Sequence, residues 1–224
     1  MAYLPAHRLK LYRNFKAIDT ADYHGIVRYY ERFEDAIGSL DTEEYFDCTL
    51  AYTTALFEIG NYGQHVVMCD HLLEVVIMQN IESWGGEDIY AHLLFRKSAA
   101  LYQLREFARS EHVLRELLKL HPWDRAAMRL LRACLLRQKP AWLMRVRATA
   151  IALTFLAAAA IAVELFVVRP FFIDYYESAM VVHNVLLASA VLLIAGGECW
   201  LYWQCDRGVC HFARSMRARK KPPG

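Results

Sequence analysis

Two long apolar segments in the C-terminal third of the chain constrain its fold more than any other feature. Residues 148–168 carry one charge, Glu164, and residues 180–203 carry one formal charge, Glu198, together with His183. Each segment exceeds the roughly 20 residues that an α-helix needs to cross the apolar core of a bilayer. The mean hydropathy of the 224-residue chain is also positive, at +0.14. The sequence therefore predicts two transmembrane helices.

Basic residues flank these two segments unequally. Arg169 is the one basic residue in the connecting segment 169–179, which is short enough to make the two helices an antiparallel hairpin. The outer flanks are rich in basic residues: Arg132, Arg137, Lys139, Arg145 and Arg147 on one side, and Arg207, Arg214, Arg217, Arg219, Lys220 and Lys221 on the other. Positively charged flanks stay on the cytoplasmic side of a membrane. Both termini are therefore expected in the cytoplasm.

The first residues do not show the pattern of a signal peptide, because no uninterrupted apolar stretch follows their basic residues. Residues 1–140 are expected to fold in the cytosol, residues 141–206 to form the two-span anchor, and residues 207–224 to form a basic cytosolic tail. The expected location is a bacterial inner membrane, and the surface of a eukaryotic organelle is the alternative.

The region from Leu4 to Pro140 shows helical patterns with frequent start and stop signals and no convincing alternating strand. Helices are expected over residues 41–60, 61–80, 88–104, 106–121 and 125–137. Asp41 and Glu44 have the spacing of a capping box at the start of the first of these helices. The segment 83–86, Ser-Trp-Gly-Gly, predicts a loop.

The segment 90–122 carries packing residues at a spacing typical of paired helices. They are Leu94, Ser98, Leu101, Phe107, Ser110, Leu114, Leu117 and Pro122. In this spacing the segment resembles a tetratricopeptide repeat, a helix-turn-helix unit of 34 residues. The resemblance implies that the small side chains of Ser98 and Ser110 let the two helices approach closely.

A weaker copy of the unit precedes this one. Aligning Tyr62 with Phe107 places Thr53, Leu56, His65 and Cys69 at the packing positions, although His65 departs from the small apolar residue expected there. The predicted fold is therefore all-α, with a tetratricopeptide-like array followed by a transmembrane helical hairpin. A helical bundle with coincidental spacing is the alternative.

The resemblance also implies a concave surface lined by the first helix of each pair. Its expected partner-binding residues are Phe95, Arg96, Tyr102, Arg129 and Arg137. Arginines beside exposed aromatic rings can bind carboxylates, so the predicted occupant is an acidic segment of a protein partner. The alternative is a solvated basic face near anionic lipid headgroups. With a net charge of +2, the chain is not expected to bind nucleic acid.

Glu164 and His183 lie at similar depths in the two apolar segments. They are predicted to form an intramembrane polar pair. Such a pair either holds the two helices together or forms part of a proton or ion path, and the sequence leaves both roles open.

Cys199, Cys205, Cys210 and His211 cluster after the second apolar segment and have the ligand types of a zinc site. Their spacing matches no recognised zinc motif, so reduced, unliganded thiols are expected. The sequence shows neither a phosphate-binding glycine loop nor a catalytic constellation. An enzyme, a cofactor and a metal are therefore not expected.

The predicted function is a membrane-anchored adaptor or scaffold that recruits a protein partner to the cytoplasmic face through its repeat groove. The competing prediction is a homo-oligomeric membrane effector or small channel, with the helical array as its sensor.

Overall fold

A computed structural model describes residues 4–168 and 176–220, and nearly all of this described part is helical. The predicted all-α class is therefore confirmed. The chain divides into two compact units. The first contains residues 1–134 and 215–224, and the second contains residues 135–214.

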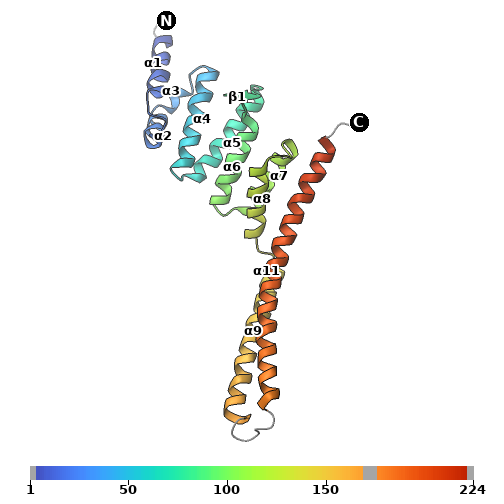
Figure 1. Cartoon of the computed structure of the whole chain (residues 1–224). Coiled ribbons are helices and arrows are strands. Elements are labelled where there is room, and N and C mark those ends of the chain that lie inside the picture. Colours follow the sequence, from blue (N-terminus) through green and yellow to red (C-terminus); the bar gives the residue numbers. More distant parts are fainter. Residues whose placement is uncertain (1–3, 169–175, 221–224) are drawn as a thin grey trace. The chain divides into compact units, whose positions relative to one another are not determined.

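The helices of the first unit follow one another in chain order (Figure 1). They are α1 (Leu4–Lys16), α2 (Tyr23–Arg32), α3 (Glu34–Ile37), α4 (Thr42–Glu58), α5 (Tyr62–Met78), α6 (Ile89–Gln103), α7 (Phe107–Leu120) and α8 (Arg125–Arg137), the last of which continues into the second unit. Helix α4 packs against α2 and α5, and α6 packs against α5 and α7. Helices α4 to α7 therefore bury apolar side chains between successive helices, whereas α2 packs mainly against α4.

Polar residues begin several of these helices. The side chains of Asp22, Asn61 and Asp88 each accept a hydrogen bond from the backbone N–H three residues further on. Such N-caps satisfy N–H groups that have no partner inside the helix. Asp41 also occupies an N-cap position, but its side chain makes no capping hydrogen bond. The capping box expected for Asp41 and Glu44 is therefore not formed.

A short β-hairpin interrupts the helices where the sequence predicted a loop. Strand β1 (Ser83–Trp84) pairs antiparallel with β2 (Glu87–Asp88). Gly85 and Gly86 form the turn with φ angles of 61° and 86°. Two-residue hairpin turns of this kind need a positive φ at both central positions, which glycine adopts without steric cost. The loop predicted over residues 83–86 therefore corresponds to the first strand and the turn of this hairpin.

The helix pairs α4–α5 and α6–α7 repeat the same hydrogen bond at a separation of 45 residues. In the first pair, the imidazole Nδ1 of His65 lies 2.7 Å from the backbone oxygen of Thr53. In the second pair, the hydroxyl of Ser110 donates to the backbone oxygen of Ser98 over 2.8 Å. All four residues are buried. The larger His65 thus occupies the position of the small Ser110 and makes the same link to the preceding helix.

The turns inside the two helix pairs repeat as well. Each turn contains a residue of positive φ, Gly60 at 83° and Arg105 at 62°. After each turn, an aromatic side chain packs against an aromatic side chain of the preceding helix. The ring centroids are 5.4 Å apart for Phe57 and Tyr62 and, again, 5.4 Å apart for the pair 45 residues later, Tyr102 and Phe107. The repetition therefore covers the turn and the packing of the helices.

The second unit consists mainly of two long helices. Helix α9 (Ala141–Val163) leads into a π-helical turn, η1 (Glu164–Val168), and α11 (Tyr176–Lys220) runs alongside α9 in the opposite direction (Figure 1). Near one end, Leu143 packs with Leu201, and Arg147 forms an ion pair with Glu198. The connecting residues 169–175, including Arg169, lie outside the described residues.

Both helices are long and apolar enough to span a membrane: the first candidate span, Ala141–Phe166, covers most of the predicted segment 148–168, and the second, Met180–Lys220, contains the segment 180–203. Only 17% of the most apolar stretch of α9 and 6% of that of α11 is buried. Helix α11 continues without a break past Arg207, the expected start of the basic tail, to Lys220. The boundary expected at residue 207 therefore lies inside a helix.

The last residues of α11 belong to the first unit. The Nε of Arg217 donates to the backbone oxygen of Pro122 over 3.0 Å, and the Nζ of Lys220 bonds to the backbone oxygen of Leu120. Leu120 is the last residue of α7 and Pro122 lies two residues beyond it, near the helix end where the dipole favours positive charge. The basic residues at this end of α11 are thus part of the helical array.

Candidate functional site

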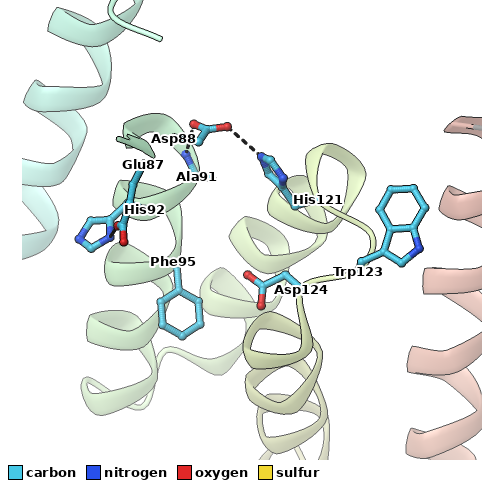
Figure 2. Close-up of a pocket in the computed structure, with 8 residues that line it drawn as sticks. All are labelled: Glu87, Asp88, Ala91, His92, Phe95, His121, Trp123 and Asp124. Atoms are coloured by element: carbon cyan, nitrogen blue, oxygen red, sulfur yellow. Dashed lines mark hydrogen bonds and ion pairs between the residues drawn. The ribbon is translucent and has the colours of Figure 1, made fainter. Parts of the chain in front are cut away.

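A cavity of about 420 Å³ opens in the first unit between the start of α6 and the turn that joins α7 to α8. It is lined by Glu87, Asp88, Ala91, His92, Phe95, His121, Trp123 and Asp124. In Figure 2, the carboxylate of Asp124 and the ring of Phe95 lie in the space between the two segments. A hydrogen bond between Asp88 and His121 crosses one end of this space.

Asp88 links the two walls of the cavity. Its Oδ1 accepts a hydrogen bond from the backbone N–H of Ala91 over 3.0 Å, and its Oδ2 lies 2.8 Å from the Nε2 of His121. Burial tends to raise the pKa of the Asp88 carboxyl, but the hydrogen bonds from Ala91 and His121 outweigh burial and hold the pKa below its usual value. Asp88 is therefore a carboxylate at neutral pH.

Asp124 lies on the opposite wall and begins α8. Its Oδ1 accepts the backbone N–H groups of Ala126 and Ala127 over 2.8 and 3.1 Å. Both capping bonds go to the same oxygen, Oδ1, so the cap does not use Oδ2. The sequence marks Asp88 and Asp124 as residues that precede helices, but it does not show that the two helix starts converge on one cavity.

His92 and Glu87 form the outer edge of the cavity on α6 and β2. The Nδ1 of His92 lies 3.5 Å from a carboxylate oxygen of Glu87. Burial lowers the pKa of His92 and the charge of Arg96 lowers it further, against the opposing effect of Glu87. The imidazole is therefore neutral at pH 7. The eight described lining residues include three carboxylates and no lysine or arginine, so the cavity has a negative electrostatic character.

The structure places the predicted groove residues differently from the expectation. Phe95 lines the cavity. Arg96 does not offer a free guanidinium: its Nη1 lies 3.2 Å from Oε1 of Glu58, and the group stands 4.9 Å from the ring centroid of Phe57. Tyr102 packs its ring against Phe107. An acidic partner would therefore have to displace Glu58 to bind Arg96.

The other two predicted groove residues are on α8. Arg129 is exposed, with its Nε 3.4 Å from the backbone oxygen of Arg125. Arg137 is the last residue of α8 and belongs to the second unit. Of the five predicted residues, only Phe95 contributes to the cavity of the first unit.

Glu164 and His183 are brought together between α9 and α11, as their depth in the sequence predicts. The Nδ1 of His183 lies 2.9 Å from Oε2 of Glu164, and both side chains are largely buried. The angles at this contact are not those of a hydrogen bond, and the described residues provide no other hydrogen-bonding partner for either atom. The two side chains are therefore in close polar contact without the geometry of a hydrogen bond.

The cysteines of α11 do not form a ligand set in the described part of the chain. Cys205 is buried, whereas Cys199 and Cys210 are exposed. Among the described residues, no group of three or more His, Cys, Asp or Glu side chains is arranged to hold a metal ion.

Neither a protein-family model, nor a curated protein, nor a solved structure matches the chain. The residues and their geometry therefore carry the functional argument.

Proposed function

We propose that this protein is a membrane-anchored adaptor whose tetratricopeptide-like array binds a segment of a partner protein. The observation that carries the proposal is the contrast between the two units. The first contains repeated helix pairs and an open cavity beside α6, and the second exposes apolar side chains along two long helices.

The exposed apolar side chains of α9 and α11 support a membrane anchor. Phe155 on α9 and Leu192 on α11 are 73% and 71% exposed, values that large apolar side chains of a soluble core do not have. A continuous apolar surface of this extent needs lipid or another protein to cover it. Lipid fits best, because the apolar stretches have the length of a bilayer span.

One end of the second unit has the composition of a membrane interface. Trp200 and Trp203 pack with their ring centroids 4.9 Å apart, and the guanidinium of Arg207 lies 3.8 Å from the ring centroid of Trp203. Tryptophan and arginine are common at the headgroup level. This end is proposed to face the cytoplasm, with both termini on that side, and the proposed membrane is a bacterial inner membrane.

The repeated helix pairs support the adaptor role. Stacked tetratricopeptide-like units form extended surfaces that bind protein segments. The repetition of the Thr53–His65 bond by Ser98 and Ser110 is evidence for such stacking. The cavity beside α6 supplies a place for side chains of the bound segment, with Phe95 and the exposed Trp123 as its aromatic residues.

The proposal is tested in native membranes with the full chain. A photoreactive phenylalanine analogue at Trp123, on the cavity, should crosslink one recurrent partner protein. The same analogue at Val67, which is 65% exposed on α5 and does not line the cavity, is the matched control. Recovery of the same partner from both positions, or of none from Trp123, would contradict docking at the cavity. Extraction of the protein by a carbonate wash would contradict the anchor.

The close contact between Glu164 and His183 favours a second candidate, a homo-oligomeric membrane effector. Ionisable groups inside a span are functional candidates because lipid disfavours them. Two helices cannot enclose a wide pore, so an effector of this kind requires several copies of the chain. A defined higher oligomer in mild detergent would favour the effector, and a monomer or dimer would favour the adaptor.

A further inference from the structure

We infer that the cavity between α6 and the α7–α8 turn recognises a lysine or arginine side chain that has apolar neighbours in the bound segment. The inference rests on the proposed adaptor function and adds the chemical identity of the recognised residue. It also reverses the charge that the sequence predicted for the partner.

The charges in the cavity select a cation. Glu87 and Asp88 on one wall and Asp124 on the other bring three carboxylates to a space of about 420 Å³. The bonds of Asp124 to the start of α8 use only Oδ1, so Oδ2 remains for a ligand. No lysine or arginine is among the described lining residues, and the two lining histidines lie against Asp88 and Glu87, so Oδ2 of Asp124 is the oxygen that a positive charge of the ligand would reach.

The apolar part of the lining selects a side chain with an aliphatic stem. Phe95 and Ala91 form the floor on α6, and Figure 2 places the ring of Phe95 opposite Asp124. Lysine and arginine bury their methylene groups against apolar surface while the charged end reaches a polar group. A cation close to the face of Phe95 also gains a cation–π interaction.

The position of Arg96 argues against an acidic ligand. Its guanidinium, the basic group nearest in sequence to Phe95, is held by Glu58 and by the ring of Phe57. A carboxylate in the cavity would therefore meet Asp88 and Asp124 without a free arginine to compensate. Repulsion between the ligand carboxylate and these two carboxylates would disfavour binding.

The test measures binding of three fluorescent peptides to the full chain in neutral detergent. The peptides are Gly-Leu-Lys-Leu-Gly and its analogues with norleucine or glutamate in place of the lysine. Lysine and norleucine share an aliphatic stem and differ in the charged end. The lysine peptide is expected to bind at least about fivefold more tightly than the norleucine peptide, and the glutamate peptide more weakly than either.

Two charge-removing variants locate the preference in the cavity. D88N and D124N remove a charge but keep an acceptor, because asparagine is as good an N-cap as aspartate. Each is expected to reduce the preference for lysine at least twofold, and the two together are expected to abolish it. D22N is the matched control, since Asp22 caps α2 through Gly25 and does not line the cavity. It should leave the preference unchanged.

Each other outcome overturns the inference. Equal binding of the lysine and norleucine peptides would show an apolar docking site without charge recognition. Tighter binding of the glutamate peptide, or an undiminished preference in the D88N/D124N double variant, would place recognition elsewhere. So would the absence of lysine-peptide binding up to about 1 mM. None of these results would contradict the adaptor function if crosslinking from Trp123 still captured the partner.

Discussion

The imidazole of His65 donates its Nδ1 proton to the backbone oxygen of Thr53 across the buried interface between α4 and α5. The carbonyl oxygen can only accept, so this contact fixes the tautomer. The Nε2 is then an acceptor and lies 3.3 Å from the thiol of Cys69. Since Ser110 makes the equivalent bond to Ser98 without a titratable group, the two helix pairs should differ in their response to acid.

Acid should destabilise the protein through His65. Burial lowers the pKa of His65 in the folded state, so the unfolded chain takes up the proton first as the pH falls. The free energy of unfolding should therefore decrease below about pH 6.5, the ordinary pKa of histidine, and level off above it. His92, whose pKa is also lowered, contributes with the same sign.

The H65S variant introduces at position 65 the residue type found at the equivalent position 110. It should make the free energy of unfolding decrease less steeply as the pH falls. Urea unfolding of the full chain in neutral detergent, followed by circular dichroism at several pH values, measures it. H112S, at an exposed histidine of α7, is the control and should keep the wild-type slope. A slope for H65S identical to that of the wild type would contradict the prediction.

Replacing glycine in one repeated turn and introducing glycine in the other should change the free energy of unfolding in opposite directions. Gly60 and Arg105 occupy equivalent left-handed positions, which cost a residue with a Cβ about 1 kcal/mol or more. G60A should lower the free energy of unfolding by about 1 kcal/mol. An added Cβ at Gly60 meets nothing within 4 Å, so the loss would be purely conformational. R105G should raise the stability.

The urea midpoint measures both effects, provided that the dependence of the unfolding free energy on urea is the same in the variants and the wild type. A stabilising G60A would show that the turn does not need the left-handed conformation.

Removing one member of the Glu164–His183 pair should cost more than removing both. E164L or H183L alone leaves a buried ionisable group without its partner, at a cost of about 3 kcal/mol or more. The E164L/H183L double variant removes both groups and should approach wild-type stability. Thermal unfolding of the four proteins in one detergent measures the coupling. Strictly additive losses would show that the two side chains do not interact.

Two exposed cysteines of α11 should differ in their reaction with a membrane-impermeant maleimide. Cys199 lies within the apolar segment 180–203, whereas Cys210 lies seven residues beyond Trp203, roughly 10 Å along the helix. In sealed vesicles whose cytoplasmic face is outward, Cys210 should be labelled and Cys199 should be protected until detergent is added. C210S should remove the vesicle signal. Labelling of Cys199 before detergent would argue against burial in lipid.

The sequence predicts the regular parts of the fold well. The last helix of the array, predicted over residues 125–137, has the same bounds in α8. Strong local signals explain this agreement, because Asp124 precedes the helix and Pro140 follows it. The closeness of Glu164 and His183 was also predictable, since an antiparallel hairpin brings together residues equally far from its connection.

Other features depend on contacts that no local pattern records. Arg96 is neutralised by Glu58, a residue 38 positions away on another helix. The hairpin at Ser83–Asp88 has strands of two residues, which are too short for an alternating pattern. The cavity arises where the starts of α6 and α8 converge, and each start alone is an ordinary N-cap. The sequence therefore predicts Phe95 as a groove residue but does not show that Glu87, Asp88 and Asp124 line the same cavity.

The bonds of Arg217 and Lys220 to the end of α7 make the apolar helix pair an insertion within the array, since the chain leaves the first unit after Cys134 and re-enters it at Ser215. Backbone cleavage at Lys139 would thus leave a fragment still joined to the array without a covalent bond. Deleting the residues after Trp203 would instead remove Arg217 and Lys220, whose side chains bond to backbone oxygens at and just after the end of α7. The last described residues of α11 are in this sense a structural element of the N-terminal half.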